Sequence, residues 1–200
     1  MDGAVELGLP LIEDQNLPNP WGISITAYNV KDGMRQSSVV AFLSDARSRP
    51  NLTIIDEALV HSLDIEGDRV TAVRYERKGQ VQTVSGGEVV LSAGTYHSPQ
   101  ILMLSGIGEG EQLKANGIEV IRDLPAVGKN MQDHLQARLV FKCNEPTLND
   151  EVRSLFNQAR IAAKYALFRS GPMTMAASLA VGFMKTGPHA DTPDIQFHVQ

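Results

Sequence analysis

Two neighbouring side chains, Asp133 and His134, are the most direct candidates for proton-transfer chemistry in the sequence. A carboxylate beside an imidazole can assist general acid–base catalysis when both groups face one reacting atom. Neighbours along a chain often point apart, however, because successive side chains leave the backbone in different directions. A structural hydrogen bond is therefore the preferred interpretation of this pair, and no catalytic residue is assigned.

The histidine pattern argues against a metal centre. None of the 5 histidines, at positions 61, 97, 134, 189 and 198, forms His-x-His or His-x-x-x-His. Those spacings would place two imidazoles on one face of a strand or helix, where they could share a metal ion. We therefore expect no metal ligands.

Other catalytic patterns are equally weak. The sequence has no Gly-x-Ser-x-Gly segment, which argues against a serine hydrolase. Its one cysteine, Cys143, has no identifiable histidine partner and is interpreted as a small buried residue. The glycines of 106–110 look like a nucleotide-binding loop, but such a loop follows a strand, and these follow an expected helix. We interpret them as a helix end.

Composition excludes several classes of partner. With 42% hydrophobic and 20% charged residues the chain can form a core, and its net charge of −5 argues against nucleic acid. No segment approaches the roughly 18 apolar residues that span a bilayer. The acidic first residues do not resemble a secretion signal. A single cysteine is typical of a reducing compartment, so we expect a cytoplasmic protein.

The first half of the chain predicts an antiparallel β-meander. Residues 23–30 alternate like a strand, and a short helix should begin at Ser37 or Ser38. Residues 58–65 should pair with 70–76, and a second turn at Lys78-Gly79 leads to 81–84.

A buried strand followed by a short helix should come next. Residues 88–92 are almost wholly apolar, as in a strand that is buried on both faces of a parallel sheet. Ser98 is a favourable helix N-cap, Pro99 suits the first helical position, and Gly106 can end the helix.

The second half predicts a further sheet with a helix packed on it. The expected strands and helices are 111–116 (helix), 118–121, 136–142, 152–168 (helix), 179–185 and 195–199.

The segment 94–108, which reads Gly-Thr-Tyr-His-Ser-Pro-Gln-Ile-Leu-Met-Leu-Ser-Gly-Ile-Gly, carries a family resemblance. It resembles, position for position, the second diagnostic motif of the glucose–methanol–choline (GMC) oxidoreductases. Similar segments flank it in the family's order, at 32–37, 49–53, 124–134 and 193–198. Ala126 and Met131 depart mildly from the family pattern. The resemblance covers nearly the whole chain.

The resemblance implies a mixed fold of the α+β or α/β class. It implies a partial FAD-binding domain of the glutathione-reductase type, with the meander, over residues 1–130. Part of a substrate domain with an antiparallel sheet should cover 131–200. The family's opening phosphate loop and its C-terminal catalytic histidine have no counterpart here, so we expect a central fragment.

The same resemblance gives three cofactor-binding candidates. Val60 corresponds to a position where family members contact the adenine of FAD through the backbone. Ala93 and Gly94 end a strand that passes close to the ADP portion, where a side chain would obstruct the cofactor.

The implied activity is FAD-dependent oxidation of an alcohol, of the choline or alcohol dehydrogenase kind, with a small-molecule alcohol as substrate. Two alternatives stay open. One is a flavin-containing lyase similar to the hydroxynitrile lyases of the same family, and the other is an inert fragment. The segments that complete the fold could be supplied by a split chain.

Overall fold

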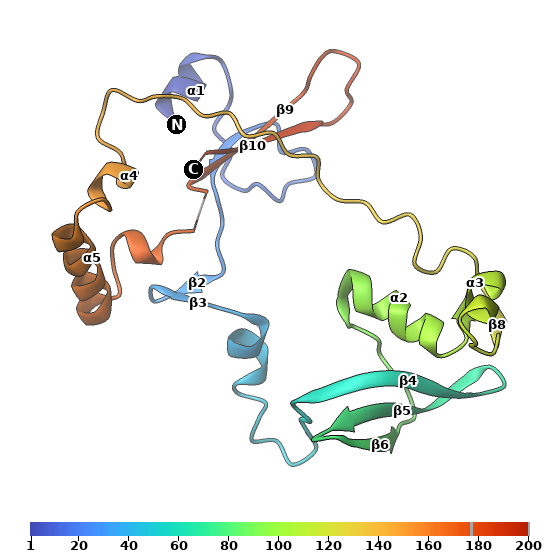
Figure 1. The fold of residues 1–200 in the computed structure, drawn as a ribbon. Coiled ribbons are helices and arrows are strands. Elements are labelled where there is room, and N and C mark those ends of the chain that lie inside the picture. Colours follow the sequence, from blue (N-terminus) through green and yellow to red (C-terminus); the bar gives the residue numbers. More distant parts are fainter. Residues whose placement is uncertain (177, 200) are drawn as a thin grey trace. The chain divides into compact units, whose positions relative to one another are not determined.

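The computed structural model describes residues 1–176 and 178–199, which form two compact units (Figure 1). One unit is Thr53–Leu139, and the other combines Met1–Leu52 with Val140–Gln200. The first 52 residues thus associate with the C-terminal part of the chain. The expected domain boundary at residue 130 concerns the complete family fold and stays a prediction.

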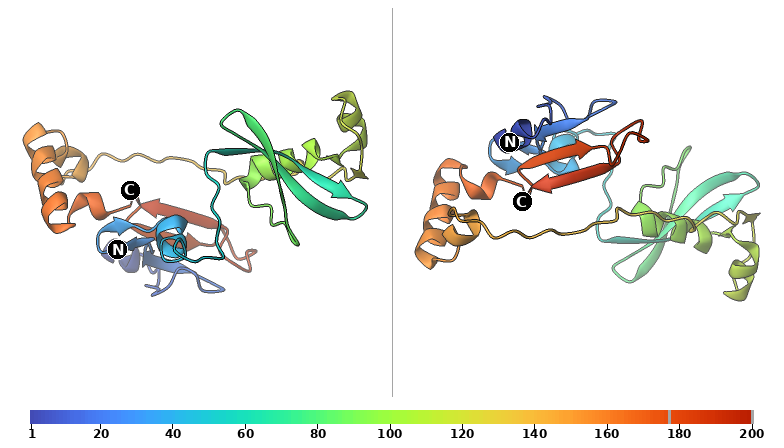
Figure 2. Two further views of the ribbon diagram at one scale, coloured as in Figure 1. Left: turned by 90° about the horizontal axis from the view of Figure 1, so that it is seen from below. Right: turned by 90° about the horizontal axis from the view of Figure 1, so that it is seen from above.

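The unit Thr53–Leu139 contains the predicted meander. Strands β4 (Ala58–Glu66), β5 (Arg69–Arg77) and β6 (Gln80–Ser85) form one antiparallel sheet in the order β4-β5-β6. Lys78 and Gly79 both have positive φ, 51° and 73°, which matches the twist of a two-residue hairpin turn. Both views in Figure 2 show this strongly twisted sheet with helix α2 (Gly94–Leu104) beside β4.

Helix α2 begins earlier than predicted. Its first residue is Gly94, so Pro99 lies inside the helix and Ser98 is not its N-cap. The Ser98 hydroxyl instead accepts a hydrogen bond from the Ala93 backbone N–H at 3.0 Å, across the first turn. The predicted helix end is confirmed, because Gly106 follows α2 with a φ of +83°.

Shorter elements follow α2 in the same unit. They are β7 (Ile107–Gly108), α3 (Gly110–Ala115) and β8 (Arg122–Asp123), with β7 and β8 paired in parallel. The predicted helix at 111–116 is therefore confirmed. The strand predicted at 118–121 is wrong, because those residues form no strand and β8 begins only at Arg122.

Two further predicted strands are wrong. Residues 88–92 and 136–142 form no strand in the described chain. Val90 is 81% exposed and Val140 is 92% exposed. Both segments have strand-like patterns, but a strand exists only when a neighbour pairs with its backbone groups. No such neighbour lies beside them among the residues described.

The other unit is built around the sheet β1-β9-β10. Strand β9 (Ala180–Met184) pairs on one side with β1 (Gly22–Ile25) and on the other with β10 (Ile195–Val199), both antiparallel. Central Val181 is only 1% exposed. These strands confirm the predictions for 179–185 and 195–199, and shorten the one for 23–30. The unit's further elements are α1 (Asp2–Glu6), β2 (Val30–Lys31), β3 (Met34–Arg35), the π-helical turn η1 (Val39–Leu43), α4 (Leu148–Glu151), α5 (Leu155–Phe168) and the 3-10 turn η2 (Pro172–Thr174).

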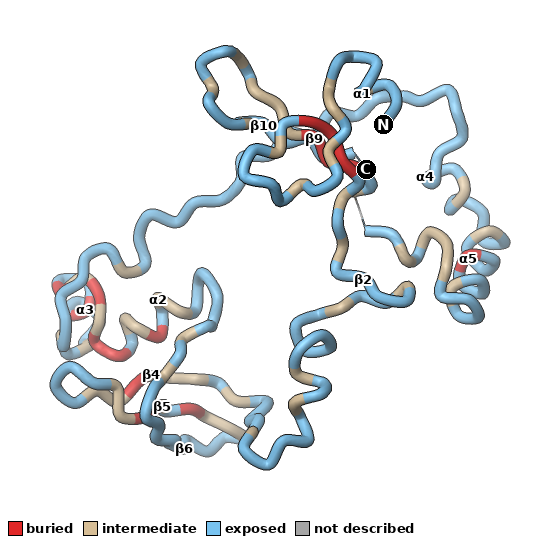
Figure 3. Tube along the Cα trace, turned by 180° about the vertical axis from the view of Figure 1, so that it is seen from behind, coloured by how far each residue is buried: buried red, intermediate tan, exposed pale blue. Residues whose placement is uncertain are grey.

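Little of the chain is buried, as the short red stretches of Figure 3 show. The accessible surface is 15829 Å². Two separate compact domains, each of half the mass of this chain, would together expose only about 11,000 Å². The excess includes many large apolar side chains, such as Phe156 on α5 at 78% exposure. Among the described helices, none combines the length and apolarity needed to cross a membrane.

Candidate functional site

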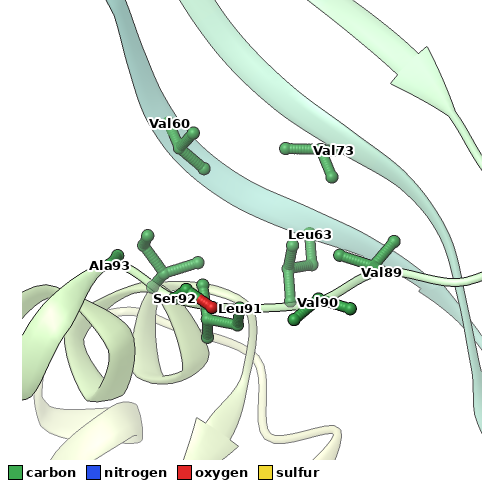
Figure 4. A pocket seen from close by; sticks show the side chains of 9 residues that line it. Val60, Leu63, Val73, Val89, Val90, Leu91, Ser92 and Ala93 are labelled. Carbon is green, nitrogen blue, oxygen red and sulfur yellow. The ribbon is translucent and has the colours of Figure 1, made fainter. Parts of the chain in front are cut away.

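An apolar pocket of about 340 Å³ lies within the unit Thr53–Leu139 (Figure 4). Its walls come from β4, β5, α2 and the segment between β6 and α2. The lining residues are Val60, Leu63, Val73, Val89, Val90, Leu91, Ser92, Ala93 and Ile101. None of them is charged at neutral pH, so the pocket suits an uncharged, largely apolar group.

The sheet wall is formed by Val60 and Leu63 on β4 and by Val73 on β5. Leu63 lies opposite Val73 in the register, which places their side chains on the same face. Strand β4 is an edge strand, since it pairs with β5 alone in the described sheet. Half of its backbone N–H and C=O groups therefore face away from β5, where they can meet another group.

The opposite wall is the extended segment 88–93. In Figure 4, Val89, Val90 and Leu91 lie along this segment, which runs beside the strand that carries Val60 and Leu63. Ala93 ends the segment and leads into the first turn of α2. The sequence gives the segment an apolar character, and the pocket uses it as a wall although no sheet forms there.

The structure brings two of the three predicted cofactor residues together. Val60 and Ala93 line the same pocket, and Gly94 follows Ala93 in the chain as the first residue of α2. An ideal Cβ on Gly94 would meet no atom within 4 Å. The space beside this backbone is therefore open, as a ligand approaching it requires.

Several lining residues were missed by the sequence reasoning. Leu63 and Ile101 are among the most buried residues of this unit, at 7% and 5% exposure. Both follow apolar patterns that predict core, and nothing in the pattern separates a pocket wall from a filled core. The alternation within 88–92 could have indicated that Val89 and Leu91 share one side.

The other candidate chemistry lies outside this pocket. Asp133 accepts a hydrogen bond at 2.7 Å from the backbone N–H of His134, and both residues are exposed. This contact fits the structural interpretation of the pair. His61 contacts Glu76 at 3.2 Å, with both side chains 40% exposed. Within the described residues, no cluster of His, Cys, Asp or Glu has a metal-binding arrangement.

Comparison with known proteins decides the family. The family model for GMC oxidoreductases matches residues 1–136, more than half of the chain. The chain belongs to the GMC oxidoreductase family. This result confirms the resemblance that the motif at 94–108 indicated.

Individual relatives extend the match to nearly the whole chain. An oxygen-dependent choline dehydrogenase of Chromohalobacter salexigens is 37% identical over 97% of the chain and 35% of that protein. An alcohol dehydrogenase [acceptor] of Pseudomonas putida is 39% identical over 92% of the chain and 34% of that protein. The 200 residues thus span about a third of the length of these curated GMC relatives.

Solved structures agree with the fold. An FAD-dependent oxidoreductase from Chaetomium thermophilum is 28% identical, with a TM-score of 0.77 over 92% of this chain and 33% of that chain. The mixed architecture of helices and antiparallel sheets is therefore a GMC architecture, as predicted.

Proposed function

We propose that this chain forms part of an FAD-dependent oxidoreductase that acts on the CH–OH group of an alcohol, and that its apolar pocket receives the adenine end of FAD. The observation that carries the proposal is that Val60 and Ala93, far apart in sequence, line one pocket, with Gly94 next to Ala93 in the chain. Membership of the GMC family supports FAD as the cofactor.

The residues present fit one end of FAD. Adenine is flat, uncharged and largely apolar on its faces, and the aliphatic side chains of Val60, Leu63 and Leu91 provide matching surfaces. The free edge of β4 offers backbone hydrogen-bonding groups for the polar edge of such a ring. No basic side chain lines the pocket, so it does not suit the pyrophosphate.

This fit separates the role of the cofactor from the role of the chain's own residues. Bound FAD supplies the hydride acceptor, since the difficult chemistry in flavoenzymes is that of the cofactor. The residues of this chain bind and orient the adenine end. The group that accepts the alcohol proton is not part of this pocket, because the reaction takes place at the flavin end of FAD and the pocket is proposed for the adenine end.

The substrate class and surroundings belong to the same proposal. The names of the relatives, choline dehydrogenase and alcohol dehydrogenase, support a small-molecule alcohol. A reducing, cytoplasmic setting fits the single free cysteine, Cys143. The expectation that this cysteine is buried is wrong, because it is exposed in the described chain. The unpaired segment 88–92 supports a partner polypeptide that supplies a neighbouring strand, whether from a longer chain or a split one.

Two alternatives predict different outcomes. A lyase that binds FAD without net redox would bind the cofactor in the same pocket but would not reduce it with an alcohol. An inert chain is favoured by one observation, the accessible surface of 15829 Å². An inert chain would bind neither ADP nor FMN.

Titration with two fragments of FAD, its ADP portion and FMN, tests the proposal. ADP should bind the chain, whereas FMN should bind much more weakly and should not displace ADP. Val60→Phe fills the pocket and should weaken ADP binding by about tenfold or more, which corresponds to ~1.4 kcal/mol. Leu59→Phe is the matched control, because Leu59 is the preceding residue of β4 and is 65% exposed. Equal binding of FMN, or equal effects of the two variants, would contradict the proposal.

A further inference from the structure

Ser105, at the C-terminal end of α2, is a buried polar residue that does not line the pocket. It is 6% exposed, and its hydroxyl makes two short hydrogen bonds. The hydroxyl donates to the backbone carbonyl of Ile101 at 2.6 Å and accepts from the backbone N–H of Leu63 at 2.8 Å. A serine hydroxyl has one hydrogen to donate, and here that hydrogen is used within the helix.

The bond to Leu63 closes the free edge of β4 at one point. Register shifts lie on both sides of Leu63, between Val60 and Ser62 and between Asp64 and Ile65. An edge strand interrupted in this way has unpaired N–H groups that need another acceptor when they are buried. Leu63 is 7% exposed, so the Ser105 oxygen provides that acceptor.

Both partners of this hydroxyl belong to the pocket. Leu63 is part of the sheet wall and Ile101 is part of the helix wall. One side chain behind the pocket thus connects two of its walls.

The end of α2 is also fixed on its other side. The carbonyl of Gly106 accepts backbone hydrogen bonds from Ile121 at 2.9 Å and from Arg122 at 3.0 Å. A Cβ on Gly106 would approach the Glu119 carbonyl oxygen to 2.5 Å, so the neighbouring loop packs directly against this turn. Ser105 therefore lies in an anchored turn and can hold β4 at a defined distance.

We propose that Ser105 is a positioning residue: its hydroxyl fixes the edge of β4 to the end of α2 and thereby sets the spacing of the pocket walls. For the identity of the ligand, this inference rests on the proposed adenine site. The geometric part of the inference does not rest on the adenine site, since the two hydrogen bonds and the pocket walls are present without a ligand.

Amide hydrogen exchange and methyl chemical shifts, measured by NMR on the full 200-residue chain, test the geometry. In the wild-type protein the Leu63 amide should be protected, although it lies on a free edge. Ser105→Ala should increase its exchange rate by about tenfold and shift the methyl signals of Leu63 and Ile101. Ser105→Thr keeps the hydroxyl and should restore the protection. Ser62→Ala removes a hydroxyl from the same strand and should change neither observable.

ADP titration of the same variants tests the connection to the ligand. Ser105→Ala should weaken ADP binding by about five- to tenfold, and Ser62→Ala should not. An unprotected Leu63 amide in the wild-type protein would overturn the inference even if Ser105→Ala fails to fold. Unchanged exchange and methyl shifts in Ser105→Ala would also overturn it. If the wild-type chain shows no ADP binding, the adenine proposal fails, while the exchange data still decide the role of Ser105.

Discussion

Gly94 carries a backbone requirement that is separate from any role in ligand binding. Its φ is +83°, a region that residues with a Cβ adopt only with strain. The space around an added Cβ is open. The expectation that a side chain at this position would obstruct a cofactor therefore needs a control for strain. Gly79, in the turn between β5 and β6, has a φ of +73° and equally open surroundings.

Substitutions at these positions should separate the two effects. Gly94→Leu and Gly79→Leu should destabilise the unit to a similar extent, because both force leucine into the same backbone region. Only Gly94→Leu should also weaken ADP binding, by about tenfold, because Gly94 adjoins the pocket residue Ala93. Val60→Ala should matter less, since the proposed contact is made by backbone. Isothermal titration calorimetry and thermal melts measure both properties. Equal effects of Val60→Ala and Gly94→Leu on binding would contradict the backbone contact.

The cofactor-binding role of the residues selected from the sequence stays a prediction. The family resemblance selected Val60, Ala93 and Gly94, and two of them line the pocket. Leu63 could not be selected, because its place in the pocket depends on register shifts in β4 that no periodicity reveals.

The hairpin of β9 and β10 shows how a single element stabilises its own turn. The Thr186 hydroxyl and backbone N–H donate hydrogen bonds to Asp194 at 2.5 and 2.7 Å. The hydroxyl bond first, and then the backbone bond, hold the pKa of Asp194 below its ordinary value of 3.8. The carboxylate therefore supports the hairpin fully above that ordinary pKa, and its contribution is lost as the pH falls through the lower folded value.

Removal of the Thr186 hydroxyl should reverse the lowering of the Asp194 pKa. Thr186→Val should raise the pKa of Asp194 toward 3.8, because the first of its stabilising hydrogen bonds is lost. NMR titration of the side-chain carboxyl carbon measures this change directly. Thr192→Val, in the same hairpin connection, is the control and should leave the pKa of Asp194 unchanged. An unshifted pKa in Thr186→Val would show that the hydroxyl does not stabilise the ionised form.

Elements that depend on local pairing were predictable from the sequence. The meander needs only short turns between consecutive strands, and its hydrophobic pattern predicted all three strands. The segments 88–92 and 136–142 have equally strand-like patterns and yet form no strand. Their pairing requires a neighbour that is distant in sequence or belongs to another polypeptide, and a local pattern carries no information about it.

For the molecule as a whole, exposed surface and family membership lead to the same expectation. The chain spans about a third of its curated relatives and exposes more surface than two compact domains of its mass would. Further polypeptide covering these apolar surfaces would account for both facts.

The chain alone should therefore show no turnover of choline or simple alcohols. The pocket is proposed for the adenine end of FAD alone, whereas hydride transfer takes place at the flavin end, and loss of a positioned general base there typically slows a reaction by about 10²–10⁴-fold. Dye reduction by the purified chain with added FAD and alcohol is the assay, with buffer plus FAD as the control. Alcohol-dependent reduction above that control would show that a catalytic group exists outside the pocket described.

NMR mapping of ADP on the isotopically labelled chain is the most direct test of the proposed adenine site. If the pocket binds adenine, ADP should cause saturable chemical-shift changes at Val60, Ala93 and Gly94. Intermolecular contacts should then connect the adenine protons with the methyl groups of Val73 and Leu91. Signals of the β1-β9-β10 sheet should stay unchanged. Shifts centred on that sheet, or saturation without any contact to the pocket methyl groups, would contradict the adenine site.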